Sequence, residues 1–482
     1  MSPFITLDIL FILLPFLVLA LGFVSQKISA ATANAGSALL LILYAIFSLC
    51  GINGQAANIT ASFLTWNVNG FGILIRELLL LSFLLASLFS NGYFAHKSDG
   101  KAALKNKPEY LSAMLFIAVG GMLVVSAQEI LSLFIGLELA TIPMYFLVAW
   151  NKKDDLGAEA ALKYILMGSI ATAVELFGFG YLYGFAGGLS FEAISDAVRN
   201  LSDAGADFNL LLIAIFFIVM GIGFKLTLFP FHTWAPDVYE GAPTPIAAYL
   251  SVSSKGVALA FLGVLVYKPL AEIGFVFQMI FTMLAMATIF IGNLGALRQT
   301  RLRRFMAYSS IAQAGYILIG LCGSERLGAA SFIYYLFLYA FSNYLLFFLI
   351  GIVGKDRSES FDSLRGLSKQ QPILAVLFAV AAFSLAGIPP LAGFIGKWMV
   401  FASAASVGNY VLVGFAAINS VIALYYYLQI IKAAWVSEDG SAALPPFSIS
   451  TEQKVVLSVL TLGVLFFGVA PFLHSYIYML AL

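Results

Sequence analysis

The stretch LLLIAIFFIVMGIGFKLTLFPFHTW, residues 210–234, places Lys225 about fifteen apolar residues into a run that is interrupted at Pro230. An apolar run of this length is typical of a membrane-spanning helix. A lysine at the centre of such a helix costs about 2.5–3.5 kcal/mol on insertion. Two more lysines, Lys255 and Lys397, lie inside other long apolar runs. Ionisable side chains at this depth usually mark a path for ions or protons, so we expect one here.

The composition predicts an integral membrane protein. Of the 482 residues, 61% are hydrophobic and 10% are charged, whereas soluble domains carry roughly 25% charged residues. The net charge of +1 points to neither nucleic acid nor an acidic partner. Cys50 and Cys322 form no disulfide framework or metal motif, since both lie in apolar surroundings. We interpret the apolar N-terminus as a first spanning helix, because it lacks the basic segment and cleavage site of a signal peptide.

We predict an all-α polytopic membrane protein with about fourteen spans and short connections. Seventeen lysines and arginines follow odd-numbered spans, and three follow even-numbered ones. Basic residues collect on the cytoplasmic side, so both termini should face away from the cytoplasm or its organellar equivalent. The predicted spans are 5–25, 34–52, 70–91, 109–127, 130–150, 158–186, 209–234, 243–267, 271–292, 303–323, 328–353, 372–403, 407–433 and 453–477.

Two of these spans are interrupted. The seventh contains Pro230 and Pro236, and the twelfth contains Gly387, Pro389 and Pro390. Proline removes a backbone donor, so such breaks occur where the backbone meets protein or water. Spans four to eight and nine to thirteen form two sets of five with the break at the fourth of each. An odd number of spans inverts the second set, which is the pattern of inverted repeats around a midplane site. We therefore divide the chain into 1–108, a first repeat 109–267, a second repeat 268–434, and a last span 435–482.

Two residues in the first repeat are expected to form the central pair. Glu138 lies in SLFIGLELATIPMYF, where an ionised carboxylate needs a partner. We predict that it pairs with Lys225, whose protonation would then respond to movement of the acid. The alternatives are an interfacial Glu138 that bonds only to a helix end, and a Lys225 that snorkels to the membrane surface.

Two further lysines are expected to continue the path. Lys255 follows Ser251, Ser253 and Ser254, whose hydroxyls would hold water. Lys397 lies beyond the second break, with no acidic residue within twenty positions on either side. It would either release its proton easily or bond to carbonyls freed by the break. The alternative for Lys397 is a structural cap on the broken helix.

Four more polar residues accompany these. As a neutral imidazole, His232 in the first break would bridge Lys225 and Lys255 through water, although a lone histidine is more often structural. Glu159 and Lys163 are four residues apart and form either a simple helix pair near the cytoplasmic end or a device by which Lys163 modulates Glu138. Glu175, deeper in the same span, is either a further acid or faces a partner subunit.

The chain contains no phosphate-binding loop, dinucleotide fingerprint or cysteine cluster. We therefore expect no redox cofactor in this chain. If the protein works in a redox complex, the electrons travel through other subunits.

Four long motifs resemble the antiporter-like membrane subunits of respiratory complex I, and the subunit N family most of all. The resemblance covers nearly the whole chain, including the absence of a long lateral helix after the last span. The motifs are GFKLTLFPFHTWAPDVYEGAPTP at 223–245, SKG at 254–256, GNLGALRQTRLRRFMAYSSIAQAGY at 292–316 and SLAGIPPLAGFIGKW at 384–398.

The resemblance implies a proton channel driven by quinone reduction in neighbouring subunits. It implies that quinone, flavin and iron–sulfur clusters are held by those subunits, and that this chain lies in a bacterial inner membrane beside other antiporter-like and small membrane subunits. It assigns no role to Glu175. The residues that match family positions are Glu138, Lys225, Lys255, Lys397, His232, Glu159 and Lys163.

Two other functions are consistent with the same residues. One is a subunit of a monovalent cation/proton antiporter that electron transfer does not drive. The other is a non-pumping scaffold, for which the three buried lysines would be dispensable.

Overall fold

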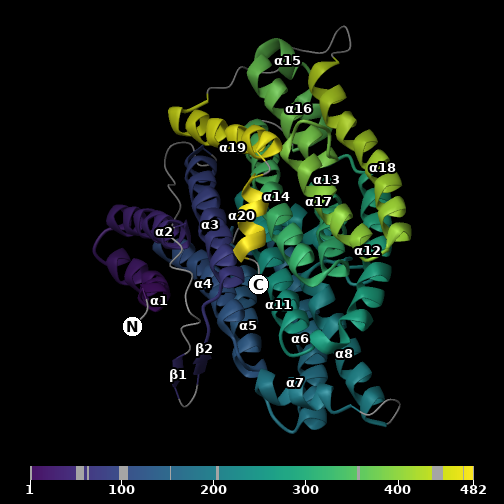
Figure 1. The fold of residues 1–482 in the computed structure, drawn as a ribbon. Helices are drawn as coiled ribbons and strands as arrows, with labels where there is room; N and C mark the ends of the chain where they lie inside the picture. Colours follow the sequence, from purple (N-terminus) through teal and green to yellow (C-terminus); the bar gives the residue numbers. More distant parts are fainter. Residues whose placement is uncertain are drawn as a thin grey trace.

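The computed structural model describes residues 3–49, 59–61, 64–96, 107–151, 154–201, 206–354, 359–436, 449–470 and 472–480, and most of these are helical (Figure 1). Thirteen helices in these ranges are long and apolar enough to cross a bilayer, and one more span is made of two shorter helices. The prediction of an all-α protein with about fourteen spans is confirmed. Eight residues named or counted in the sequence argument lie outside the described ranges: Cys50, Lys97, Lys101, Lys105, Lys152, Lys153, Lys355 and Arg357.

Three helices precede the first repeat. They are α1 (Pro3–Gly22), α2 (Gln26–Leu49) and α3 (Gly70–His96). The antiparallel strands β1 (Ile59–Ala61) and β2 (Leu64–Trp66) form a short hairpin between α2 and α3. The two strands are the departure from an all-helical chain, and they lie between spans rather than within one.

A buried ion pair fastens α3 to its neighbours. Arg76 is fully buried, and its guanidinium donates two hydrogen bonds of 2.8 Å to Asp8 on α1. The same group bonds to Ser126, the last residue of α4 (Lys107–Ser126). A buried arginine needs such partners because an unpaired charge inside protein is expensive. This contact is structural and lies apart from the three central lysines in sequence.

The first repeat contains the five predicted spans, with the fourth interrupted as expected. Its elements are α4 (Lys107–Ser126), α5 (Ile130–Val148), α6 (Asp155–Ala186), α7 (Phe191–Arg199), α8 (Ala206–Lys225), α9 (Ala235–Gly241), α10 (Thr244–Tyr249), the π-helical turn η1 (Leu250–Ser254) and α11 (Lys255–Tyr267).

The second repeat has the same order of spans and the same place for its break. Its elements are η2 (Ala271–Ile273), α12 (Gly274–Ala296), α13 (Leu302–Leu318), η3 (Ile319–Cys322), α14 (Glu325–Val353), η4 (Phe361–Leu364), α15 (Leu367–Gln370), α16 (Pro372–Ala386), α17 (Ala392–Ser406) and α18 (Tyr410–Trp435).

The end of the chain differs from the prediction. One span over 453–477 is expected, but α19 (Thr451–Val469) ends earlier and α20 (Phe472–Leu480) follows in a new direction, running down beside α14 (Figure 1). In the sequence, Pro471 comes shortly after the end of α19. The residue before a proline is disfavoured in helical conformation, which favours the end of a helix here. Hydropathy alone does not register this change of direction, because both segments are apolar.

The breaks in the two repeats arise from backbone conformations that end a helix. After Lys225, Thr227 adopts a left-handed conformation with φ of 60°, which is costly for a β-branched residue. After α16, Gly387 has φ of 88°, which glycine adopts without steric cost. The peptide bonds before Pro230 and Pro390 are both cis. One lysine lies just before its break and the other, Lys397, just after, as inversion of the repeat requires.

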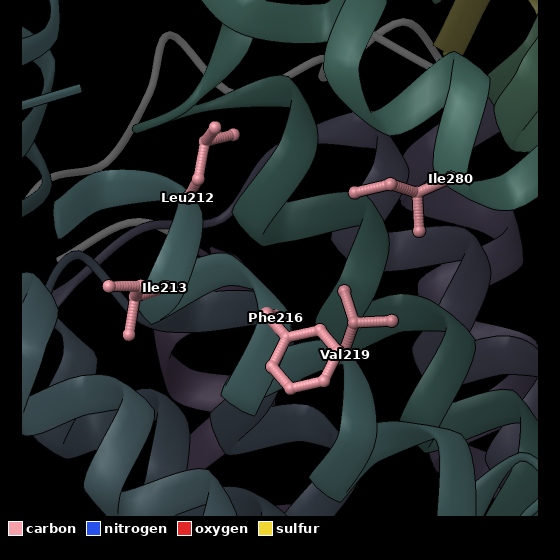
Figure 2. Close-up of a pocket in the computed structure, with 5 residues that line it drawn as sticks. All are labelled: Leu212, Ile213, Phe216, Val219 and Ile280. Atoms are coloured by element: carbon pink, nitrogen blue, oxygen red, sulfur yellow. The ribbon is translucent and has the colours of Figure 1, made fainter. Parts of the chain in front are cut away.

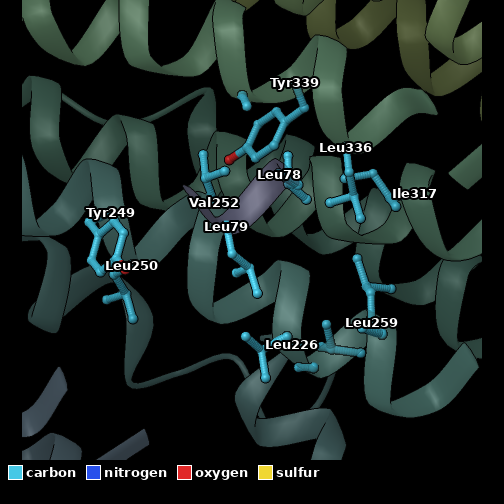
Figure 3. Packing of buried hydrophobic residues seen from close by; sticks show 14 of the residues in the cluster. Leu78, Leu79, Leu226, Tyr249, Leu250, Val252, Leu259, Ile317, Leu336 and Tyr339 are labelled. Atoms are coloured by element: carbon cyan, nitrogen blue, oxygen red, sulfur yellow. The ribbon is translucent and has the colours of Figure 1, made fainter. Parts of the chain in front are cut away.

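The core lies where the two repeats meet α3. Nearly every residue of α11, α13 and α14 is buried. Figure 3 shows this packing, in which side chains of α3, η1, α11, α13 and α14 interlock. The side chains contributed by these elements include Leu78, Leu79, Val252, Leu259, Ile317, Leu336 and Tyr339. The interior is therefore shared by both repeats. In sequence, Lys225 precedes the break of its span, and Lys397 follows the break of its own.

A shallow hollow on the outside of α8 and α12 is a feature of the apolar surface. It has a volume of about 380 Å³ and is lined by Leu212, Ile213, Phe216, Val219 and Ile280 (Figure 2). Hydrocarbon side chains cannot bind or release a proton. The hollow is therefore not the candidate site, which lies among the polar residues of the interior.

Candidate functional site

The first ionisable cluster brings together side chains of α5, α6 and α8, with α6 packed against α8. Lys225 is the last residue of α8, and its buried Nζ donates a hydrogen bond of 2.6 Å to Glu138 Oε1 on α5. Thr172 of α6 donates a second hydrogen bond of 3.0 Å to the same oxygen. The expected pair therefore forms in the structure. The acid is less buried than predicted, because α5 turns Ile135 and Ile142 outward and leaves 16% of the neighbouring Glu138 side chain exposed.

A second carboxylate approaches the same ammonium. Glu175 on α6 is fully buried, and its Oε2 lies 3.5 Å from Lys225 Nζ. Lys225 thus lies between two acids rather than beside one. Of the two alternatives for Glu175, a further acid or a residue facing a partner subunit, its burial beside Lys225 favours the first. The sequence shows its depth in α6 but not the identity of the facing helix.

An aromatic layer lies between this cluster and Lys163. On α6, Tyr164 lies between Lys163 and Glu175, and its ring stacks on Trp234 with centroids 4.5 Å apart. Trp234 lies 4.9 Å from the Phe224 ring and donates its indole hydrogen to the Phe224 carbonyl at 3.0 Å. This bond satisfies one of the carbonyls that the end of α8 leaves without a helical partner.

A charged mouth opens beyond the aromatic layer. Lys163 Nζ lies 2.7 Å from Glu159 and 3.0 Å from Asp237. Arg304 of α13 reaches Asp237 at 2.7 Å and Glu240 at 3.0 Å. These side chains surround a hollow of about 170 Å³ that also includes Arg301. The mouth is therefore polar and open, whereas the cluster around Lys225 is largely buried.

The geometry distinguishes between the two interpretations of Lys163. Its partners are Glu159 and Asp237, as in a helix pair extended by one more acid, whereas Glu138 pairs with Lys225 and Thr172. Burial alone would raise the pKa of Asp237, but hydrogen bonds from Lys163 and Arg304 outweigh it and hold that pKa below its usual value. Asp237 is accordingly a stable anion that fixes the two cations at the mouth.

His232 lies half-buried in the turn of the first break. Its ring is 5.9 Å from that of Phe229, and its Nδ1 has no hydrogen-bond partner within the described part of the chain. The direct partners of Lys225 and Lys255 are other residues. A bridging role for His232 therefore depends on water and stays a prediction.

The second ionisable site is Lys255 at the junction of the repeats. The π-helical turn η1 ends at the residue before it, and such turns often occur at functional sites. Lys255 is buried, and its Nζ donates to both the carbonyl and the hydroxyl of Ser310 on α13, the latter at 2.6 Å. The hydroxyls of Tyr239 and Tyr339 each lie 3.1 Å from the same Ser310 hydroxyl. In this contact, the Lys255 ammonium therefore donates only to neutral groups.

The third site is Lys397, one and a half turns into α17. It is buried, and its Nζ donates 2.8 Å to the carbonyl of Ala386, the last residue of α16. The same nitrogen lies 4.4 Å from the centre of the Tyr316 ring, in cation–π geometry. The bond to a carbonyl freed by the break, which the sequence analysis expected as one alternative, is present, and easy release of the proton stays a prediction. This geometry is compatible with a helix cap as well as with proton transfer.

A polar side chain of α13 lies between the second and third sites. Gln313 donates 2.9 Å to the carbonyl of Leu385, which is adjacent to the carbonyl that Lys397 uses. Its side-chain oxygen accepts a hydrogen bond of 2.5 Å from Tyr335. Ser310 is one helical turn away on α13, so the polar groups of Lys255 and Lys397 approach each other along this helix.

Residue-by-residue reasoning missed the contribution of α13. The segment YSSIAQAGY, residues 308–316, places Ser309, Gln313 and Tyr316 at three- and four-residue intervals, which puts them near one face of a helix. Polar residues on one face of an apolar span indicate a polar partner. This polar face is visible in the sequence, but the sequence does not show which buried lysine contacts it.

The arrangement can hold and transfer protons. Three buried amines lie beside acids, hydroxyls and carbonyls, and each amine donates at least one hydrogen bond. Within the described residues, no group of three or more His, Cys, Asp or Glu side chains is placed to hold a metal ion.

Comparison with known sequences identifies relatives over most of the chain. Residues 127–423 match the family described as NADH:quinone oxidoreductase/Mrp antiporter, transmembrane. NADH-quinone oxidoreductase subunit N from Azobacteroides pseudotrichonymphae is 40% identical over 78% of this chain and 77% of its own length. Subunit N from Paramagnetospirillum magneticum is 37% identical over 82% of this chain and 80% of its own length.

Comparison with solved structures gives the same fold. A chain in respiratory complex I from Thermus thermophilus with bound aureothin is 29% identical, with a TM-score of 0.79 over 97% of this chain and 98% of its own length. A chain of the Mrp complex from Dietzia sp. DQ12-45-1b has a TM-score of 0.88 at 19% identity, over 100% of this chain and 97% of its own. The second likeness concerns the fold alone.

Proposed function

Because the chain belongs to the NADH:quinone oxidoreductase/Mrp antiporter membrane family, we propose that it is the proton-translocating, subunit N-type component of an NADH-quinone oxidoreductase. The observation that carries this proposal is the ion pair of Lys225 with Glu138, buried beside a broken helix. A lysine at this depth is costly unless it serves a pathway. As one subunit of a translocase, the chain moves protons while other subunits carry out the redox chemistry.

The proposed path runs through the three lysines in order. A proton taken up at the mouth around Lys163 and Glu159 reaches Lys225, whose charge Glu138 stabilises. It then passes to Lys255 with His232 as a neutral bridge through water, and from there to Lys397. Each transfer needs a donor and an acceptor within hydrogen-bond reach, directly or through one water. Quinone reduction in other subunits drives the sequence by changing the charge near the first pair.

The two repeats supply the two halves of this path. Residues 109–267 would form the half-channel that opens to the cytoplasm, and residues 268–434 the half-channel that opens to the other side. The segments 1–108 and 435–482 flank them. Most of the residues that line the charged mouth belong to the first half, with Arg301 and Arg304 contributed by the second, which supports uptake through the first half.

The partial exposure of Glu138 supports a neighbouring membrane subunit. Its side chain is 16% exposed beside Ile135 and Ile142, which are about half exposed. A carboxylate facing lipid would be expensive. We therefore place a further antiporter-like or small membrane subunit of the complex against α5 and α6, in a bacterial inner membrane with both termini on the non-cytoplasmic side. Quinone, flavin and iron–sulfur clusters belong to other subunits of the complex.

The test is Lys225→Ala in the assembled complex, reconstituted in vesicles. We expect impaired coupled quinone reduction and fewer protons moved per electron. Normal proton stoichiometry in this variant would contradict the proposal.

The alternative is a monovalent cation/proton antiporter subunit, because the matching family also includes Mrp antiporters. It predicts sodium or potassium exchange in vesicles that contain no electron donor. The subunits that co-purify with the chain decide between the two, because a pump of the proposed kind requires quinone-site and iron–sulfur subunits.

A further inference from the structure

The cluster around Lys225 has more acid than base. Glu138 and Glu175 approach the same Nζ at 2.6 Å and 3.5 Å. With all three groups ionised, the cluster would carry a net charge of −1 inside the protein. An uncompensated buried charge costs several kcal/mol even after relaxation. A bound proton removes this cost, so one of the two carboxylates is expected to be neutral.

The surroundings of the two acids identify which one holds the proton. Glu138 accepts hydrogen bonds from both Lys225 and Thr172, and it is partly exposed. Glu175 is fully buried, and neither of its oxygens has a hydrogen-bond donor within the described part of the chain. Hydrogen bonds favour the ionised form of a carboxyl group, and burial disfavours it. The burial of Glu175 and its lack of hydrogen-bond donors therefore both favour its neutral form.

The backbone fixes Glu175 in this place. Gly221 of α8 lies directly against it, since a Cβ at that position would be 2.5 Å from the Glu175 Cβ. A similar close approach occurs at Gly178, where a Cβ would lie 2.8 Å from the backbone nitrogen of Ile218. Helices α6 and α8 are therefore in close contact on both sides of the carboxyl group, which cannot swing out toward lipid or the mouth.

Resting on the proposed function, we infer that Glu175 is a proton reserve for Lys225. In the resting cluster Glu138 is ionised, Lys225 is protonated and Glu175 is neutral. When Lys225 passes its proton toward Lys255, its amine is left 3.5 Å from the Glu175 carboxyl. The O–H bond of Glu175 then breaks and an N–H bond forms on Lys225. A proton from the mouth later protonates Glu175 again. Lys225 therefore regains its proton before a new proton has been taken up at the mouth.

The test uses the assembled complex in vesicles with three variants: Glu175→Gln, Glu138→Gln and the double variant. Glu175→Gln should slow coupled quinone reduction about tenfold, less than the 10²–10⁴ of a fully essential proton-transfer group because the mouth still supplies protons. In Glu138→Gln, Glu175 ionises and becomes the partner of Lys225, so activity is reduced but kept. The double variant leaves Lys225 without a counter-ion and should lose far more than the two single effects combined.

An infrared measurement provides a readout that a structural role would not change. The wild type should show a carbonyl band from one neutral carboxyl group that disappears in both Glu175→Gln and Glu138→Gln and persists in Glu175→Asp. The aspartate variant also serves as the control if the glutamine variant assembles poorly. A band that survives in Glu175→Gln, a normal rate in that variant, or additive effects in the double variant would each overturn the inference.

The outcome separates this inference from the proposed function. If Lys225→Ala abolishes coupling while Glu175→Gln behaves as wild type, only the reserve fails. If Lys225→Ala leaves proton stoichiometry normal, the proposed function itself fails.

Discussion

Lys225 and Lys397 lie beside the broken helices of the two repeats, but they are stabilised in different ways. Lys225 lies between Glu138 and Glu175, so its positive charge has two negative partners. Lys397 has the carbonyl of Ala386 and the face of the Tyr316 ring, which are both neutral. The two repeats share the order of spans and the position of the break, and they differ in the charge placed next to the lysine.

Within the proposed proton path, we infer that this difference gives the two halves of the molecule different tasks. The attraction between opposite charges holds a proton on Lys225 until the acids move or change their charge. The charged form of Lys397 has only dipoles for compensation, and a buried charge stabilised by dipoles alone is costly. A proton that reaches Lys397 is therefore in a site suited to release. The comparison assigns uptake and storage to the first repeat and discharge to the second.

The largest expected effect comes from removing each lysine in turn. Lys225→Met leaves the ionised Glu138 without its cation, next to the buried Glu175, and breaking a buried ion pair costs about 3–5 kcal/mol. Lys397→Met leaves one carbonyl without its donor, so it should cost no more than about 1–3 kcal/mol. Thermal unfolding of the purified complex measures both, with the exposed Lys454→Met on α19 as a control. Equal losses for the two buried lysines would contradict the comparison.

The next effect sharpens the description of the second break. Gly387→Ala combines a backbone φ of 88° with a Cβ that would lie 2.9 Å from Lys397 Cδ. The backbone strain costs about 1–3 kcal/mol, and the side chain of Lys397 must move away from the Ala386 carbonyl. We expect a loss of both stability and coupled quinone reduction.

A matched control separates strain from displacement. Gly408 has φ of 80°, and an added Cβ there would meet nothing within 4 Å. Gly408→Ala should therefore lose similar stability while its coupled rate stays normal. If both variants lose the same activity, displacement of Lys397 is not the cause.

A smaller effect is expected at the junction between the halves. Ser310→Ala removes the 2.6 Å hydroxyl contact of Lys255 but keeps the contact to the Ser310 carbonyl. One hydrogen bond is worth about 0.5–1.5 kcal/mol, and the hydroxyls of Tyr239 and Tyr339 also lose a partner. We expect a several-fold slower coupled rate, measured beside Ser458→Ala on the exposed face of α19. An unchanged rate would remove Ser310 from the path.

The smallest effect concerns Asp237 at the charged mouth. The pKa of Asp237 lies below its ordinary value of 3.8, so its ionised form stabilises the fold above that value, and the stabilisation is lost as the pH falls through the lowered pKa. Asp237→Asn should cost less than about 1 kcal/mol near neutral pH, because the group is partly exposed. Unfolding measured over a series of acidic pH values should show a flatter pH dependence in the variant. An unaltered slope would mean that Asp237 does not hold the two cations.

Much of this architecture could be read from the chain itself. Long apolar runs, prolines in the seventh and twelfth spans and five-span spacing gave the fold, because a bilayer requires about twenty apolar residues and rarely tolerates broken helices. The pair of Glu138 and Lys225 was also predictable, since each residue is costly alone. The partial exposure of Glu138 and the contact of Lys163 with Asp237 were not, because both depend on how separate helices pack against one another.

The sequence by itself determined which residues are forced into the membrane interior: the three lysines and the acids whose burial demands a partner. Only the tertiary structure decided which groups these side chains contact. It placed Glu175 against Lys225 through the contact at Gly221, brought Ser310 to Lys255 and gave Lys397 a carbonyl instead of an acid. The reason is physical: the cost of burying a charge is local and is visible in one helix, whereas its compensation comes from other helices, whose rotation and separation are set by side-chain packing.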